Sequence, residues 1–252
     1  MSPDPPVTDA PAAVAALRER GWAVVSAAGL AALTGVAVPM LAPLSSSWTA
    51  LPPDTWLKDG GKYRSRRHSC FIVAGDDVAP VDHRAHWQSV DYNALHGGLA
   101  RWFEPMESAV VMSPAWSQLL RGLAAVVSAP TPPARGNDER WFVEAHQFRI
   151  DTKLGIGRPT PEGAHRDGVD FVVVILVDRQ AIKGGETRVF DALGSAGVRF
   201  ALTEPWSALL LDDARVMHET TPIQPATPGE LGGHRDTLVI TFRRGAFQGP
   251  GT

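Results

Sequence analysis

The sequence contains only one cysteine, Cys70, so no disulfide can form within the chain. A single cysteine fits a reducing compartment, and we expect Cys70 to be a buried, unreactive thiol. No apolar run approaches the roughly 18 residues of a membrane span, and the N-terminus lacks the basic and apolar segments of a secretion signal. These absences predict a cytoplasmic protein without a membrane partner.

A large excess of charge is also missing, because 24 basic residues stand against 27 acidic ones, a formal net charge of −3. This balance supplies no bulk attraction to nucleic acid or to anionic lipid. We therefore expect a small-molecule partner and no nucleic acid, in a monomer or homodimer. A chain of 252 residues can form one domain with a sizeable core.

Helical patterns predominate in the first part of the chain. Residues 1–10 are rich in proline and polar side chains, which predicts disorder, and residues 11–252 are expected to form a single domain. Within it, region 11–140 is predicted to provide helical support and a lid. Its expected helices span 11–20, 29–34, 95–103 and 116–127, its expected strand spans 22–25, and 129–139 is expected to be a loop.

From residue 141 the sequence is predominantly of strand type. Short runs separated by Gly, Pro and Asp predict strands over 141–150, 163–169, 171–177, 186–190, 198–202, 207–212, 216–221 and 235–243. Many short strands without intervening helices indicate an antiparallel double sheet or barrel. We predict an α+β, mainly β fold: a jelly-roll core over 141–245 with N-terminal helices packed on one sheet.

Candidate metal ligands stand at the start of one predicted strand. His165 and Asp167 are two residues apart, so in an extended chain their side chains project to the same side. An imidazole and a carboxylate form an N/O donor pair suited to a divalent first-row metal. His-x-Asp is a common triplet and occurs again at His234–Asp236, so its setting beside an apolar strand is what favours the first copy.

His218, at the end of another apolar run, completes a set of two histidines and one carboxylate. Three protein ligands on one face of an octahedron leave three positions open, as in non-haem Fe(II) enzymes, whereas zinc is more often tetrahedral. Arg235 follows 17 residues later, and alternation places Thr237 on its face. A guanidinium with a neighbouring hydroxyl can bind the far carboxylate of a dicarboxylate, although an interstrand ion pair would also explain Arg235.

Four sequence segments complete this pattern: 144–150 (EAHQFRI), 165–171 (HRDGVDF), 184–187 (GGET) and 217–222 (MHETTP). Over 141–242 the chain resembles the bacterial 2OG-Fe(II) dioxygenases that include free L-isoleucine and L-leucine hydroxylases and biofilm-stress-and-motility A-like (BsmA-like) proteins. The resemblance implies a double-stranded β-helix of cupin-like type, Fe(II) on His165, Asp167 and His218, and 2-oxoglutarate held by Arg235 and Thr237. It also implies O2 as oxidant and ascorbate as an accessory reductant. The product would be a hydroxylated or S-oxidised small molecule, most simply a free aliphatic L-amino acid.

Substrate-binding residues are harder to predict. The basic run at 60–68 is interpreted either as a solvated loop or as a lid that brings Tyr63 and Arg66 to an anionic group. On segment 141–150, Gln147 and Arg149 share a face that would line the pocket and touch substrate or 2-oxoglutarate, which leaves His146 without a role. An ion pair with a neighbouring acidic residue would also explain Arg149.

Two acidic residues and three further histidines are also relevant to substrate and metal binding. Glu144 or Asp170 could accept a substrate amine. We interpret His83, His86 and His96 as surface or capping residues, because they are too scattered along the chain to predict a metal cluster.

Two alternatives remain open. The same iron core could act on a peptide or another small metabolite. The fold could also belong to a non-catalytic, cupin-like binding protein, because a fold alone does not determine a function.

Overall fold

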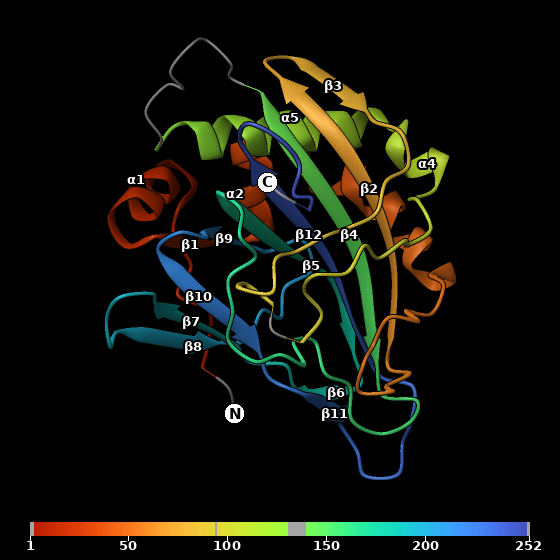
Figure 1. Cartoon of the computed structure of the whole chain (residues 1–252). Coiled ribbons are helices and arrows are strands. Elements are labelled where there is room, and N and C mark those ends of the chain that lie inside the picture. Colours follow the sequence, from red (N-terminus) through yellow and green to blue (C-terminus); the bar gives the residue numbers. More distant parts are fainter. Residues whose placement is uncertain (1–2, 94, 131–139, 251–252) are drawn as a thin grey trace.

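The structure is a computed structural model that describes residues 3–93, 95–130 and 140–250. A large antiparallel sheet of seven strands forms its centre (Figure 1). In spatial order these strands are β1 (Trp22–Val25), β9 (Ala208–Asp212), β5 (Phe171–Gln180), β12 (His234–Arg243), β4 (Trp141–Asp151), β2 (Arg64–Ala74) and β3 (Asp77–Pro80).

A smaller three-stranded sheet packs against the large one. It contains β10 (Val216–Thr220), β7 (Thr187–Asp191) and β8 (Gly197–Phe200), and a short pair, β6 (Ile182–Gly184) with β11 (Ile223–Pro225), extends the arrangement. All of these pairings are antiparallel. The predicted mainly β, jelly-roll fold is therefore confirmed.

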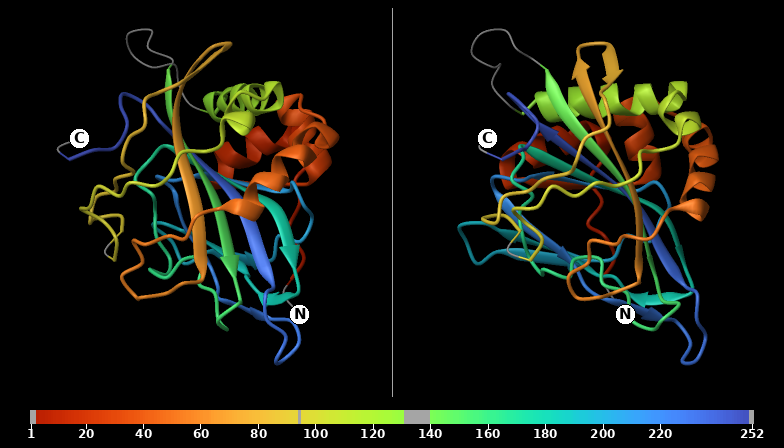
Figure 2. Two further views of the ribbon diagram at one scale, coloured as in Figure 1. Left: turned by 90° about the vertical axis from the view of Figure 1, so that its right-hand side faces the viewer. Right: turned by 45° about the vertical axis from the view of Figure 1, so that its right-hand side comes forward.

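Helices cover the outer face of the large sheet, as Figure 2 shows from the side. They are α1 (Ala10–Arg20), α2 (Ala27–Thr34), α3 (Val38–Leu41), α4 (Ser108–Val111) and α5 (Pro114–Ser128), with the 3-10 helix η1 (Ala42–Ala50). The main hydrophobic core lies between them and the sheet. Because side chains alternate along a strand, Trp141, Val143 and Ala145 of β4 point to this core, and the intervening residues point to the other face.

The space between the two sheets has two unlike ends. At the β1, β9 and β8 end it is filled by a second apolar cluster that includes Val172, Leu211 and Phe200. At the β2, β4 and β12 end the inner face carries polar and charged side chains. The segments 81–93 and 95–107, yellow to yellow-green in Figure 2, cross this polar end.

Several predicted boundaries are corrected by the structure. The core does not begin at residue 141, because β1, β2 and β3 belong to the large sheet. The basic run that we expected in a loop or lid is largely the first part of β2. Residues 3–9 contact the domain through a parallel bridge between Val7 and Val24, so their predicted disorder is wrong; residues 1–2 lie outside the described part of the chain.

Two predicted elements are not formed as expected. Described residues of the segment 95–103 form turns and extended chain instead of a helix, and Gly97–Gly98, with Gly98 at φ +74°, gives the reason. Residues 163–169 form a loop instead of a strand. The loop predicted over 129–139 lies almost wholly outside the described residues.

No single helix in the described ranges is long and apolar enough to cross a membrane. α2 and the segment Val38–Ala50 are long and apolar enough only when taken together, and they are bent by 89° relative to each other.

Candidate active site

A cavity opens between the two sheets at their polar end. Its walls come from the inner faces of β2, β4 and β12, from β10, from the segment between β3 and α4, and from the loop before β5. His165, Asp167 and His218 all line it. The predicted metal ligands and most of the buried charge between the sheets therefore share one chamber.

The structure brings the three predicted metal ligands together. His165 Nε2 lies 3.8 Å from Asp167 Oδ1, and His218 Nε2 lies 3.8 Å from Asp167 Oδ2. The backbones of His165 and His218 form two reciprocal hydrogen bonds of 3.1 and 2.9 Å, which bring the loop alongside β10. Three donors converging from a loop and a strand leave the cavity side of the cluster open.

The tautomer of neutral His165 and the low pKa of His218 suit metal binding. Nδ1 of His165 lies 2.9 Å from the carbonyl oxygen of Gly163, which can only accept, so Nδ1 carries the proton and Nε2 keeps its lone pair. Burial lowers the pKa of His165, but the carboxylates of Asp167 and Glu162 outweigh it and the net pKa is raised. Burial, together with the neighbouring His165, holds the pKa of His218 well below its usual value.

Asp213 holds the loop that carries Asp167. Its carboxylate accepts hydrogen bonds from three successive backbone N–H groups, those of Asp167, Gly168 and Val169, at 2.9, 2.8 and 3.1 Å. Gly168 permits this turn because its φ is +77°. The buried carboxylate of Asp213 therefore holds the loop that carries His165 and Asp167, which is not part of a strand.

Arg235 provides a site for an anion in the same cavity. The side chain is buried, and its Nε and Nη2 have no hydrogen-bond partner. Burial and the nearby Arg179 lower the pKa of Arg235 to about 10, so it remains charged at neutral pH. A buried, unpaired guanidinium is costly unless an anion binds it, and Thr237 lines the cavity two residues away. These residues fit the distal carboxylate of 2-oxoglutarate, and the two histidines and Asp167 fit Fe(II).

Three more arginines line the far part of the cavity: Arg64, Arg66 and Arg101. Asp54 pairs with Arg64 at 2.7 Å and lies 3.8 Å from Arg66. Nε of Arg66 and Nε of Arg101 are buried without partners. This end of the cavity therefore holds unsatisfied N–H donors for a second anionic group.

Glu162 provides an unsatisfied negative charge in the same chamber. Its Oε1 lies 3.7 Å from Nε2 of His165, and its Oε2 is buried with no hydrogen-bond partner. Glu162 and Arg101 are close enough for the carboxylate to raise the pKa of Arg101, although burial leaves that pKa lowered overall, to about 10. Glu162 and Arg101, of opposite charge, thus line one cavity, and Oε2 of the first and Nε of the second have no hydrogen-bond partner.

The structure places several predicted substrate residues elsewhere. Gln147 points to the helical face of the sheet and donates to Ser47 Oγ. Arg149 forms a bidentate ion pair with Asp236, and the hydroxyl of Tyr63 donates to Asp59 outside the cavity lining. For Gln147 and Arg149 the strand face was predicted incorrectly.

Arg66 does line the cavity, as predicted, and so does His146, to which no role was assigned. His86 and His96 also line the cavity and are buried, so they are not surface residues. The alternative prediction of a capping role fits His96, whose Nε2 accepts a hydrogen bond from the backbone N–H of Lys58. Asp170 instead caps a turn by accepting from the backbone of Arg244. Glu144 is already hydrogen-bonded to two histidines.

Gln88, Arg101 and Glu162 are cavity residues that sequence reasoning missed. They lie in irregular segments without periodicity, and no local pattern distinguishes them from surface residues. Only their unsatisfied or shared hydrogen bonds in the folded chain identify them.

Comparison with known proteins agrees with this geometry. The sequence model of a family described as 2OG-Fe dioxygenase matches residues 45–241. The crystal structure of a bsmA homologue from Methylobium petroleophilum PM1 is similar, with 49% sequence identity, coverage of 99% of both chains and a TM-score of 0.91. The comparison with curated proteins gave no match.

Two more distant structures share the fold. IDO from Bacillus thuringiensis is 18% identical, with coverage of 96% of this chain and 100% of the other and a TM-score of 0.74. The Fe(II)/α-ketoglutarate-dependent dioxygenase TqaL is also 18% identical, with coverage of 95% and 92% and a TM-score of 0.68.

Proposed function

We propose that this chain, which belongs to the 2OG-Fe dioxygenase family, oxidises a small zwitterion, a free aliphatic L-amino acid. The reaction would hydroxylate the side chain of the substrate or, in methionine, oxidise the sulfur. The observation that carries the proposal is a pair of buried, oppositely charged side chains, Glu162 and Arg101, each with one atom, Oε2 and Nε, that has no hydrogen-bond partner. Both line the cavity that also holds His165.

The family uses Fe(II), 2-oxoglutarate and O2. His165, Asp167 and His218 would hold the iron, and Arg235 with Thr237 would hold the distal carboxylate of 2-oxoglutarate. Bound together, these groups supply an oxidant for an unactivated C–H bond or a thioether while 2-oxoglutarate is converted to succinate and CO2.

The remaining cavity residues would select and orient the substrate. The Glu162 carboxylate would accept an ammonium group, and Arg101 would donate to a carboxylate, each through a charge-assisted hydrogen bond, because Oε2 of the first and Nε of the second are buried without a partner. Val169, Val174 and Val239 provide an apolar wall for an aliphatic side chain. Holding both charged ends fixes which carbon faces the iron, which is how a small substrate gains positional specificity.

Charge balance in the cavity supports a substrate without net charge. Four arginines line the cavity, Arg64, Arg66, Arg101 and Arg235, and three carboxylates, Glu144, Glu162 and Asp167. Asp54, outside the lining, forms an ion pair with Arg64 and brings the carboxylates to four. Fe(II) and the 2-oxoglutarate dianion cancel each other. Because uncompensated buried charge is expensive, a zwitterion fits this chamber better than a cation or an anion.

Succinate release tests the proposal. The purified chain is incubated with Fe(II), ascorbate, 2-oxoglutarate, O2 and each of the twenty amino acids, and products are examined by mass spectrometry. We expect leucine, isoleucine or methionine to stimulate succinate formation and to gain one oxygen atom. Iron-bound protein that responds to none of the amino acids would contradict the amino-acid substrate, and failure to bind iron or 2-oxoglutarate would contradict the enzyme itself.

A further inference from the structure

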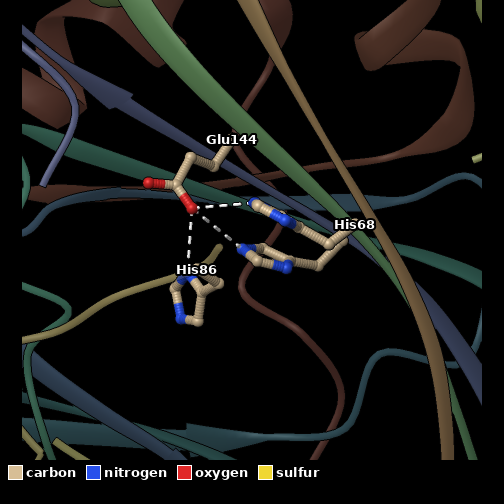
Figure 3. A group of neighbouring side chains, drawn as sticks. His68, His86 and Glu144 are labelled. Carbon is tan, nitrogen blue, oxygen red and sulfur yellow. Dashed lines mark hydrogen bonds and ion pairs between the residues drawn. The ribbon is translucent and has the colours of Figure 1, made fainter. Parts of the chain in front are cut away.

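A second group of potential metal ligands lies in the cavity wall, away from His165. His68 of β2, Glu144 and His146 of β4, and His86 from the segment after β3 are all buried. Figure 3 shows His68 and His86 directed at one oxygen of Glu144. One nitrogen or oxygen atom of each of the four residues lies within 4.8 Å of the others.

Sheet register explains why these side chains meet. β2 and β4 pair so that His68 lies opposite His146 and Cys70 lies opposite Glu144. All four therefore project from the inner face of the sheet at adjacent positions. His86 is held above them by the two reciprocal backbone hydrogen bonds that it forms with Arg101.

The tautomers of the histidines show which rings have a lone pair available for a cation. Nη2 of Arg66 lies 2.7 Å from Nδ1 of His146, and because a guanidinium only donates, Nδ1 must accept. Neutral His146 then carries its proton on Nε2 and has no lone pair left for a cation. His68 Nε2 and His86 Nδ1 each lie 2.8 Å from Glu144 Oε2 and have no such constraint.

A fourth donor stands beside these three. Sγ of Cys70 lies 3.4 Å from Nε2 of His68. Two imidazoles, a carboxylate and a thiolate make a four-donor set of the type that zinc accepts in tetrahedral coordination. A divalent ion with one carboxylate and one thiolate is neutral overall, whereas the metal-free cluster carries the single negative charge of Glu144.

We propose that His68, His86, Glu144 and Cys70 form a second divalent metal site, of the zinc class, distinct from the site at His165. His86 and Glu144 line the cavity, so an ion can reach the site from that side. The ion would cross-link β2, β4 and the segment that carries His86, Gln88 and Arg101.

Each proton on His68, His86 and Cys70 has a place to go when a metal binds. Burial lowers the pKa of His68 and lowers the pKa of His86 to about 4, so both rings are neutral at physiological pH. On metal binding each ring keeps one proton, which moves to its other nitrogen. Burial raises the pKa of the Cys70 thiol, so its proton leaves to solvent only when a cation binds the sulfur.

Cobalt titration of a variant without the iron ligands tests the proposal. In the full-length His165→Ala/His218→Ala chain, freed of metal with a chelator, we expect one equivalent of Co²⁺ to bind. Its absorption should show tetrahedral cobalt with a thiolate charge-transfer band. Wild-type protein loaded with Zn²⁺ should contain two equivalents by elemental analysis.

Three further variants locate the ion. Cys70→Ser should lose the charge-transfer band, and His86→Gln should weaken Co²⁺ binding by at least about 100-fold, the upper end of the loss that removal of an outer-shell partner causes. His83→Gln, outside this cluster, should bind as its parent does. Circular dichroism establishes that each variant is folded, and Cys70→Ser still decides the question if His86→Gln is not.

Two results would overturn the proposal. If the variant without iron ligands binds no Co²⁺, the cluster is a metal-free hydrogen-bond network around Glu144. If it binds Co²⁺ equally with and without the Cys70 and His86 substitutions, the ion lies elsewhere, for example at Asp178, His234 and Asp236.

Discussion

Gln88 donates a hydrogen bond of 2.9 Å from its Nε2 to Oδ1 of the candidate iron ligand Asp167. The orientation of the amide is unambiguous because its oxygen accepts from Arg101 Nη2 at 3.0 Å, and a guanidinium can only donate. Oδ1 is therefore engaged, which favours metal binding through Oδ2 alone. The same amide connects the guanidinium of Arg101, which we propose to bind substrate, to the candidate metal ligand Asp167.

Replacement of Gln88 by leucine should weaken Fe(II) binding. The variant removes the hydrogen bond that orients Asp167, and loss of such an outer-shell partner costs about 10- to 100-fold in metal affinity. Anaerobic Fe(II) titration measures the effect. The control Gln118→Leu, which removes only a bond to the Gly35 carbonyl at the surface, should bind iron normally. Equal affinities in the two variants would show that Gln88 does not position Asp167.

The convergence of His165, Asp167 and His218 could be predicted from the sequence, but not for the reason that strand alternation suggested. His165 and Asp167 were identified by residue type, spacing and setting. Their side chains converge because Asp213 binds three backbone N–H groups of a loop, and Asp213 lies 46 residues from Asp167. No local pattern contains that long-range contact.

The face of β4 that lines the cavity could have been predicted from the sequence. Trp141, Val143 and Ala145 form an apolar stripe that packs on the helices, so Gln147, in the same stripe, also faces them. That stripe was available in the sequence and would have placed His146 and Glu144 in the cavity. By contrast, the first half of β2 is polar on both faces, so its burial became evident only from its pairing with β4.

Arg235→Ala should raise the KM for 2-oxoglutarate on the order of 30-fold or more. The buried guanidinium has two unpartnered nitrogens, and loss of a buried charge-assisted pair costs roughly 2–5 kcal/mol. Initial rates of succinate formation at varied 2-oxoglutarate give the KM, and Fe(II) affinity should be nearly unchanged. Arg149→Ala is the matched control, because it breaks the ion pair with Asp236 outside the cavity. If Arg235→Ala changed the KM for the amino acid and left the KM for 2-oxoglutarate unchanged, Arg235 would not be the residue that binds 2-oxoglutarate.

Glu162→Gln should raise the KM for the amino acid at least about 10-fold, equivalent to about 1.4 kcal/mol, because the neutral amide loses the charge that attracts an ammonium group. Substrate-independent turnover of 2-oxoglutarate should persist, since the iron ligands remain. Glu104→Gln, at an exposed carboxylate, serves as the control. An unchanged amino-acid KM in Glu162→Gln would contradict the assignment.

Acid should destabilise the metal-free protein through His86. Burial lowers the pKa of His86 to about 4 in the folded chain, against about 6.5 in the unfolded chain. Between these values only the unfolded chain binds the proton, so stability is present above about pH 6.5 and is lost as the pH falls toward 4. The loss amounts to about 3 kcal/mol.

Urea unfolding of wild type and His86→Gln, with chelator present, measures this contribution. The variant should be less sensitive to acid by about that amount, because its side chain does not titrate. Parallel losses of unfolding free energy in the two proteins over this pH range would show that His86 is not the responsible group.

The requirement for both charges of the substrate tests the central claim most directly. The most active amino acid is compared with two analogues of the same side chain, one without the α-amino group and one without the α-carboxylate, in the succinate-release assay. If Glu162 and Arg101 bind the two ends of a zwitterion, neither analogue should stimulate succinate formation at concentrations at which the amino acid saturates. Full stimulation by either analogue would contradict the account.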